Sequence, residues 1–240
     1  MPYRLNEKSL IKNCKESGVI FDLFGTLVPA YNHHAVLRSM AEALQVDPEA
    51  FIHAFVIETR SARESGAYES LNANIREICE AFGVPAHEDR VKEAVEIRRK
   101  FNRNALRPRE DAEKTITELK SKGYRIGLIS DCSADVPGLW LLNPLAPLFD
   151  AAVFSCLVRI KKPDLRIYRL ALDQLDIQAE QCLFVGDGGS NELQGAERAG
   201  MKAVKLYVEE EQAIDPYRPG AAEWNGSVIA SLSEILDLIS

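Results

Sequence analysis

The sequence has no apolar run close to the length of a bilayer span. A transmembrane helix needs about 20 consecutive apolar residues, and charged residues interrupt every hydrophobic run of this 240-residue chain well before that. The first 17 residues also have no unbroken apolar stretch followed by a small-residue cleavage site, so no secretory signal is recognised. From these absences we expect no membrane partner and a cytoplasmic location.

Cysteine is sparse and scattered. The chain has five cysteines, with no CxxC pair and no cluster of cysteine and histidine. An odd number of dispersed cysteines argues against a disulfide framework and against a zinc site. The pattern predicts free thiols in a reducing compartment.

Positive charge is in the minority, with 29 Lys and Arg against 36 Asp and Glu, which gives a net charge of −7. No basic stripe with interleaved aromatic residues is present, so we expect no nucleic-acid partner. Some of the carboxylates are candidates to hold a cation. The length suits one α/β domain, or a core that carries a smaller insert.

Five short and nearly continuous apolar runs predict parallel strands that are buried on both faces. They lie at residues 19–21, 125–129, 151–154, 182–185 and 203–206. Helical patterns follow the later strands, at residues 108–122, 164–175 and 191–199, and a last helix is expected at 231–239 after a loop at 215–220. This alternation predicts βαβ units and an α/β fold with a parallel sheet.

The stretch between the first two strands has a different pattern. It shows no strand, and four helices are expected, at residues 36–44, 48–63, 71–82 and 88–104. We therefore divide the chain into a first core segment at 1–30, a helical insert at 31–107 and the rest of the core at 108–240.

Polar residues follow the predicted strands, at the edge where open α/β sheets bind ligands. Asp22 comes directly after the first strand, with Gly25 to turn the chain and Thr26 to offer a hydroxyl. Ser130 and Asp131 follow the second strand. Taken singly, each of these features is also common in ordinary turns.

Two later motifs complete the set. Lys162 stands before Pro163 at the start of a helix, where an ammonium group can face a phosphate. The run GDGGSNE after the fourth strand contains Asp187 and Glu192. Carboxylates are ligands that Mg²⁺ accepts, usually one or two together with substrate phosphate and water.

With these motifs in this order, the chain resembles the haloacid dehalogenase (HAD) superfamily of hydrolases over nearly its whole length. The helical insert resembles the α-helical cap of the subfamily that includes phosphoglycolate phosphatase, β-phosphoglucomutase and the L-2-haloacid dehalogenases. The resemblance implies a Rossmann-like core with a parallel sheet and an inserted four-helix cap. It also implies a hydrolase of small phosphorylated molecules that exists as a monomer or a homodimer.

The resemblance assigns roles to the motif residues. Asp22 would be the nucleophile, and Ser130 and Lys162 would bind the transferring group. The Mg²⁺ ligands would be Asp22, the backbone carbonyl of Phe24, Asp187, and Glu192 directly or through water. The phosphate-binding loop would be completed by Gly25, Thr26 and the backbone near Asp131.

One position departs from the family pattern. Phosphatases of this superfamily usually have an acid two residues after the nucleophile, which protonates the leaving alcohol and then activates water. Here that position is Phe24, which does neither. L-2-haloacid dehalogenases also lack this acid, but they lack the Gly-Asp pair of the last motif as well, and this chain keeps Gly186 and Asp187.

Three interpretations therefore stay open. A Mg²⁺-dependent phosphatase is favoured, a metal-independent dehalogenase is the first alternative, and a weakly active phosphate-binding regulatory protein is the second. The cap is expected to select the substrate, with Arg63 as the foremost candidate contact. Further polar candidates are Tyr31, His33, His34, Arg60 and Tyr68.

Overall fold

A six-stranded parallel sheet forms the centre of the computed structural model, which describes residues 17–212, 214 and 224–239. The strand order is β3-β2-β1-β4-β5-β6. The strands are β1 (Gly18–Phe21), β2 (Arg125–Ser130), β3 (Ala151–Phe154), β4 (Cys182–Gly186), β5 (Lys202–Leu206) and β6 (Ser227–Ile229). The predicted α/β fold with a parallel sheet is confirmed. The sequence analysis did not find β6, because three residues are too few to show a pattern.

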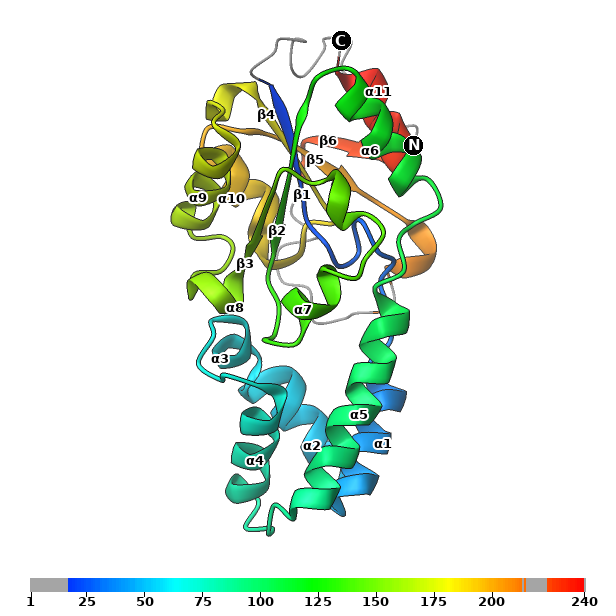
Figure 1. Cartoon of the computed structure of the whole chain (residues 1–240), viewed down its shortest axis with the longest axis vertical. Coiled ribbons are helices and arrows are strands. Elements are labelled where there is room, and N and C mark those ends of the chain that lie inside the picture. The colour runs from blue at the N-terminus through cyan, green and yellow to red at the C-terminus, as the bar shows by residue number, and fades with distance from the viewer. Residues whose placement is uncertain (1–16, 213, 215–223, 240) are drawn as a thin grey trace.

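Helices cover both faces of the sheet (Figure 1). One face is covered by α6 (Ala112–Ser121) and α11 (Ile235–Leu238), and the other by α9 (Leu165–Leu175) and α10 (Glu192–Arg198). Alternate residues of β1 serve the two layers: Val19 and Phe21 belong to the hydrophobic cluster that includes α6, whereas Ile20 belongs to the one that includes α9. This is the expected period of a strand that is buried on both sides.

Short helical turns connect these elements. They are α7 (Val136–Trp140), α8 (Ser155–Val158), η2 (Ala146–Leu148), η3 (Ala179–Gln181), η4 (Gly189–Asn191), η5 (Glu209–Glu211) and η7 (Leu232–Glu234). The last helix predicted at 231–239 is thus a 3₁₀ turn followed by the short α11. The loop predicted at 215–220 lies outside the described residues.

The helical insert forms a separate body below the core in Figure 1. Its elements are α1 (His34–Leu44), α2 (Pro48–His53), η1 (Ala54–Glu58), α3 (Arg60–Glu64), α4 (Leu71–Ala81) and α5 (Glu88–Ala105). The insert has a hydrophobic cluster of its own, separate from the two clusters that flank the sheet. Helices α1 and α5 lie side by side and connect the insert to the core (Figure 1).

The insert and the core also meet where α3 lies next to α8 (Figure 1). Gly66, just after α3, has a φ of +70°, and a Cβ at this position would come within 2.1 Å of the carbonyl oxygen of Cys156. Only glycine tolerates both the left-handed backbone and this close approach. The contact therefore brings the cap backbone directly against the core.

The prediction of a single helix at 48–63 is wrong. The structure divides it into α2, the π-helical turn η1 and α3. The side-chain hydroxyl and the N–H of Thr59 both donate to the carbonyl of Ala54, at 3.0 and 2.9 Å, which is the i to i−5 spacing of a π-turn. A π-turn changes the direction in which the following side chains point, and those of α3 include Arg60 and Arg63.

Two other helices begin later than expected. Helix α6 begins at Ala112 rather than at 108, because the N–H of Arg109 is bound to the carbonyl of Leu27 at 2.9 Å. Helix α10 begins at Glu192, since Asn191 has a left-handed φ of 54°.

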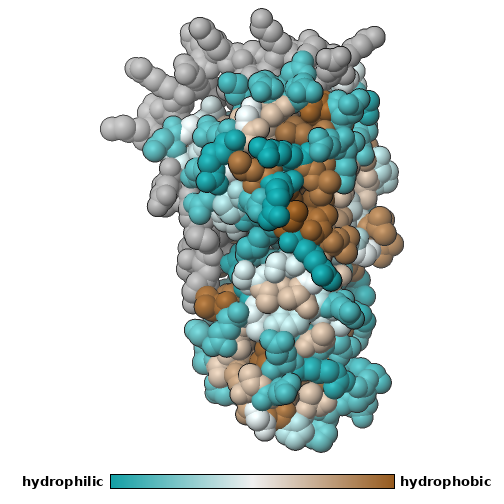
Figure 2. Space-filling view, turned by 90° about the vertical axis from the view of Figure 1, so that its left-hand side faces the viewer, coloured by the Kyte–Doolittle hydropathy of each residue, from teal (hydrophilic) through white to brown (hydrophobic). Residues whose placement is uncertain are grey.

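No helix among the described residues is long and apolar enough to cross a membrane. Figure 2 shows that on one face hydrophobic atoms gather mainly over the core, while the surface of the cap is more mixed. The large hydrophobic side chains that the structure leaves exposed are Ile57, Leu141, Leu142 and Leu157.

Candidate active site

The motif residues meet at the carboxyl edge of the sheet. Asp22 follows β1 directly, and its N–H donates to the carbonyl of Val185 on β4 at 2.9 Å. Ser130 is the last residue of β2, and Asp187 follows β4. Because β1 lies between β2 and β4, the ends of these three strands deliver their side chains to one place.

Lys162 lies buried between the carboxylates of this site, in the loop between α8 and α9. Its ammonium group donates to Asp22 Oδ1 and to Glu192 Oε2, the latter at 2.6 Å. Burial disfavours the charged ammonium, but Asp22 and Glu192 outweigh it, so the pKa of Lys162 lies well above its usual value. Lys162 is therefore a fixed positive charge beside Asp22.

Glu192, at the start of α10, has protein donors at both carboxylate oxygens. Lys162 Nζ contacts Oε2, and the N–H of Gly188 donates to Oε1 at 3.0 Å. Gly186 leaves room for the side chain, since a Cβ there would lie 2.2 Å from Glu192 Oε1. Glu192 thus orients Lys162 and holds the turn that contains Asp187.

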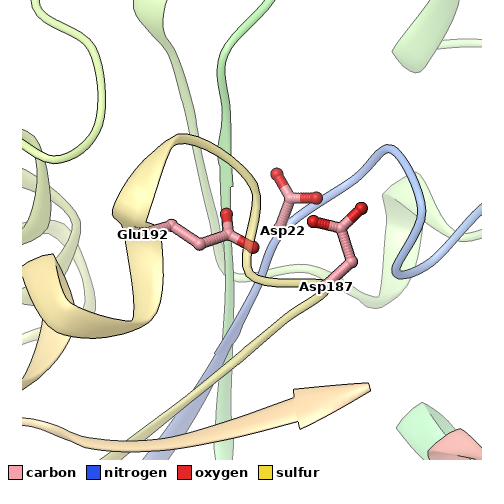
Figure 3. Close-up of side chains that lie close together, drawn as sticks. All are labelled: Asp22, Asp187 and Glu192. Atoms are coloured by element: carbon pink, nitrogen blue, oxygen red, sulfur yellow. The ribbon is translucent and has the colours of Figure 1, made fainter. Parts of the chain in front are cut away.

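Three buried carboxylates, Asp22, Asp187 and Glu192, point toward one another (Figure 3). One oxygen from each lies within 4.8 Å of the others. Opposite ligands of an octahedral Mg²⁺ are about 4.1 Å apart, so the cluster is close to the size that the ion requires. These hard oxygen donors fit a divalent cation.

The charge balance also favours a cation. Asp131 adds a fourth carboxyl group, which accepts from the backbone N–H of Lys162. The ammonium group of Lys162 contacts two of the four, Asp22 and Glu192. Burial raises the pKa of Glu192 well above its usual value, although Lys162 opposes the rise, and burial raises the pKa of Asp131 to about 6. Burial is the main cause of both rises, and the neighbouring carboxylates Asp22 and Asp187 add to that of Glu192.

Two predicted phosphate-binding hydroxyls are buried without a hydrogen-bond partner among the described residues. They are Ser130 Oγ and Thr26 Oγ1. A buried polar atom without a partner costs about 1–3 kcal/mol, so each is a candidate to bind a ligand or water. Gly25, with φ of 81°, turns the chain away from Asp22 and donates its N–H to the carbonyl of Val28 at 2.8 Å.

The loop after Asp22 is anchored by an ion pair that the sequence analysis missed. Arg109 donates from Nε to the carbonyl of Thr26 at 2.7 Å and from Nη2 to that of Gly25 at 3.0 Å. Glu211 accepts two hydrogen bonds from the same guanidinium, both at 2.7 Å, and one from the N–H of Ala30 at 2.8 Å. Arg109 and Glu211 are 102 positions apart, and no local motif connects them.

A cavity of about 180 Å³ lies between core and cap, and the acidic cluster forms part of its lining. From the core it is lined by Asp22, Phe24, Asp131, Lys162, Asp187 and Glu192, among others. Gly25, Thr26 and Ser130 are not among its lining residues. The size is below the range of most drug-sized ligand pockets and suits a small molecule.

Four of the predicted cap candidates line this cavity: Tyr31, His33, Arg60 and Arg63. His34 and Tyr68 do not, and the Tyr68 hydroxyl donates instead to Glu77 at 2.6 Å. The ring of Tyr31 packs against the edge of Phe24 with 5.9 Å between centroids. Phe24 therefore presents an apolar surface where phosphatases of the resembled type have an acid.

The sequence analysis missed Arg98, which lines the cavity from α5. Helix α5 is rich in charged residues, and a charged residue in such a helix is usually solvated. The signal was the spacing: Arg98 lies on the same helical stripe as the buried residues Val91, Val95 and Asn102.

The comparison with protein families is consistent with this geometry. The model of the haloacid dehalogenase-like hydrolases matches residues 17–200, so the chain belongs to that family and is a hydrolase.

Two curated relatives are phosphatases. A glyceraldehyde 3-phosphate phosphatase of Methanothermobacter thermautotrophicus is 31% identical over 138 residues, which are 56% of this chain and 59% of the relative. The chain thus covers little more than half of that protein's length. Pyrophosphatase PpaX of Bacillus cereus is 27% identical over 234 residues, 92% of this chain and 95% of the relative.

Among solved structures, a 2-haloacid dehalogenase of Pseudomonas syringae is similar, with a TM-score of 0.66 and 24% identity. The match covers 92% of this chain and 97% of that one. At this identity the similarity shows the fold alone. Since phosphatases and a dehalogenase both appear among the similar proteins, the chemistry must be argued from the site.

Proposed function

We propose that this protein is a Mg²⁺-dependent phosphatase that acts on a small phosphorylated metabolite through an aspartyl-phosphate on Asp22. The observation that carries the proposal is the buried cluster of Asp22, Asp187 and Glu192 around Lys162. Glu192 also orients Lys162, which needs no metal, but a metal-independent hydrolase has no use for Asp187 as a further carboxylate beside Asp22. The phosphatase names of the curated relatives support the same choice.

In the proposed reaction, the Asp22 oxygen that does not contact Lys162 attacks phosphorus. The bond between phosphorus and the leaving-group oxygen breaks, and water then hydrolyses the Asp22 acyl phosphate to release inorganic phosphate. Lys162 and the Ser130 hydroxyl stabilise negative charge on the transferring group. Asp22, Asp187 and the Phe24 carbonyl would hold Mg²⁺, with Glu192 acting through water. The ion supplies charge neutralisation at the phosphoryl oxygens.

Phe24 restricts which leaving groups depart. General acid–base catalysis typically contributes about 10²–10⁴-fold, and the Phe24 side chain supplies none. We therefore propose that the best substrates have leaving groups that depart without a proton: acyl phosphates, anhydrides or aryl phosphates. Pyrophosphate, which the name of the Bacillus cereus relative denotes, is such an anhydride.

The test is a series of aryl and alkyl phosphates of graded leaving-group pKa, assayed with Mg²⁺ and with EDTA. We expect hydrolysis only with Mg²⁺ and a rate that falls steeply as the leaving-group pKa rises. A rate that does not depend on leaving-group pKa would contradict the role given to Phe24. Activity that survives EDTA would contradict the metal-dependent reaction.

A second candidate function is metal-independent dehalogenation of a 2-haloacid, which Phe24 favours because halide leaves without a proton. Release of halide from 2-chloropropionate in EDTA would establish it. A third candidate, a regulatory protein that binds phosphate without turnover, is tested by trapping. We expect a BeF₃⁻ adduct on Asp22 in the wild type and none in Asp22→Asn, whereas a relic site would form no adduct.

A further inference from the structure

The cap end of the cavity contains two arginines without an ion-pair partner among the described residues. Arg98 is 8% exposed, and Arg63 is partly buried. Both line the cavity that contains Asp22 and Lys162. Burial of a cation without a counterion is strongly unfavourable, so this arrangement calls for an explanation.

The hydrogen-bond partners of Arg63 are neutral. Its Nη1 donates to the carbonyl of Phe55 at 2.8 Å, to Thr59 Oγ1 at 3.1 Å and to Asn74 Oδ1 at 3.3 Å. Its guanidinium also lies 4.0 Å from the centroid of the Phe55 ring. These contacts fix the position of the guanidinium but bring no negative charge into direct contact with it.

The partner of Arg98 is neutral as well. Its Nη1 lies 2.9 Å from His33 Nδ1. Burial, followed by the nearby Arg98, lowers the pKa of His33 to about 2, so the imidazole is uncharged at neutral pH. Since a guanidinium only donates, Nδ1 accepts and the proton of the ring is on Nε2.

Both arginines keep their positive charge. Burial and then Arg98 lower the pKa of Arg63 to about 10, which still leaves it protonated at neutral pH. Burial also lowers the pKa of Arg98. Two guanidinium groups that destabilise each other in one cavity are stabilised by an anion placed between them.

The nearby carboxylates have other partners. Glu64 accepts from Arg60 at 2.8 Å and from Lys161 at 2.9 Å. Asp135 accepts from Ser133 Oγ at 2.6 Å and from Asn102 Nδ2 at 2.5 Å. Glu64 acts on Arg63, and Asp135 acts on both arginines, only across a distance.

We propose that Arg63 and Arg98 form a second anion-binding subsite, which holds an oxyanion on the leaving group while its phosphoryl group lies at Asp22. The substrates are then small phosphate compounds with two anionic groups, the second being a carboxylate or another phosphate. The planar fork of a guanidinium matches both oxyanions. This inference rests on the proposed phosphatase function and names its substrate class.

The test is binding of three non-hydrolysable phosphonates to the intact protein with Mg²⁺, measured by calorimetry. Phosphonoacetate has a carboxylate, methylenediphosphonate has a second phosphonate, and phosphonoacetamide replaces the carboxylate with a neutral amide of the same shape. We expect the wild type to bind one or both of the double anions at least about tenfold more tightly than the amide. Which one binds identifies the source of the second anion.

Arg63→Gln and Arg98→Gln should each abolish this preference and leave the affinity for phosphonoacetamide within about threefold. Arg98→Lys, which keeps the charge and is closer in volume, replaces Arg98→Gln if that variant does not fold, and it should retain part of the preference. Arg99→Gln is the matched control: Arg99 is an exposed neighbour on α5 that pairs with Glu96, and its loss should change nothing.

Equal affinity of the wild type for phosphonoacetate, methylenediphosphonate and phosphonoacetamide overturns the inference and leaves the phosphatase proposal standing, because the phosphoryl site still binds. A preference that persists in both Arg63→Gln and Arg98→Gln also overturns it. If none of the three compounds binds, the phosphoryl site itself is absent, and both proposals fail together.

Discussion

At the scale of single residues, Phe24 is an apolar side chain among the charged residues of the site. Asp22 and Lys162 are in contact, and Asp187 lies beside them. Phe24 lines the same cavity but offers only its ring and its backbone. Which substrates such a site can cleave depends on whether their leaving group needs a proton to depart.

Phe24→Asp should therefore raise kcat/KM for alkyl phosphates by about 10²-fold or more, because it restores a general acid two residues after the nucleophile. The rate for aryl phosphates with good leaving groups should change much less. Phe24→Asn is the control, since it has nearly the same shape as Asp but no proton to give. If both variants improve alkyl substrates equally, or neither does, the missing acid is not what limits the rate.

That Asp22, Ser130 and Asp187 lie together could be predicted from the sequence, because each ends or follows an apolar strand and parallel strands deliver their ends to one edge. The roles expected of them came from the family resemblance. Arg98 could not be predicted in this way. Whether a charged residue on a helix is buried depends on which face of that helix packs, and for α5 this depends on α1 and α4.

At the scale of elements, the loop after Asp22 is held by Arg109 and Glu211, whose side chains are both 12% exposed. Arg109 lies just before α6 and Glu211 lies in the turn η5. Arg109 binds two carbonyls of the loop that follows Asp22. Bidentate and largely buried ion pairs fix geometry more firmly than exposed ones. The pair thus supports the position of Asp22, the proposed nucleophile.

Glu211→Gln should lower kcat by roughly tenfold with little change in KM, since small displacements of a reacting group can cost up to about 10²-fold. Steady-state kinetics on an aryl phosphate measure this split. Glu210→Gln, an exposed neighbour in the same turn, should behave as the wild type. A rise in KM at unchanged kcat would show that the pair acts on substrate binding instead.

Another element-scale contact joins α3 of the cap to the core. Glu64 accepts from Arg60 on its own helix and from Lys161 in the core loop before α9. Burial opposes its ionisation, but Arg60 and Lys161 outweigh burial and lower the pKa of Glu64 below its usual value of 4.5. A carboxyl group with a depressed pKa stabilises the fold above its unfolded pKa and loses that effect as the pH falls through the folded pKa.

Glu64→Gln should accordingly reduce the free energy of unfolding at pH 7 by about 1–3 kcal/mol. The difference from the wild type should shrink as the pH falls below about 4.5. Urea unfolding between pH 7 and pH 3.5 measures it. Glu80→Gln, at an exposed position on α4, is the control. A difference that stays constant with pH would mean that the charge of Glu64 is not what stabilises the contact.

At the scale of the whole molecule, the two ends of the cavity have opposite charge. The core end gathers Asp22, Asp131, Asp187 and Glu192 around Lys162, and the cap end presents Arg63 and Arg98. A cation is therefore complementary to the core end, and an anionic substrate is complementary to the cap end. The net charge of −7 gave no indication of this separation, because composition does not record position.

Mg²⁺ should raise the melting temperature of the protein, because a ligand that binds only the folded state stabilises it by mass action. Thermal unfolding with millimolar Mg²⁺ against EDTA measures this without any assay of activity. Asp187→Asn should remove most of the increase, and Asp173→Asn, at an exposed position on α9, should keep it. An equal increase in all three proteins would indicate a non-specific effect of the salt.

The sequence predicted the sheet and the helical insert well because both depend on local hydrophobic patterns. It did not predict the π-turn at Thr59, which depends on a hydroxyl that competes for one carbonyl. Nor did it predict how the cap packs against the core, since the contact of Gly66 with Cys156 joins segments 90 positions apart (156 − 66). Patterns record neighbours along the chain, whereas the cavity is made by contacts between distant segments.

The separate hydrophobic cluster of the cap has an evolutionary consequence. The chain leaves the core before α1 and returns after α5, two helices that lie side by side, so both covalent connections of the insert are at one place, and its other contact with the core is that of α3 (Figure 1). Mutations can therefore repack its interior, or change Arg63 and Arg98, without altering the packing of the sheet that holds Asp22. A lineage built on this plan can acquire new substrates by drift in one module while the reaction itself is inherited unchanged.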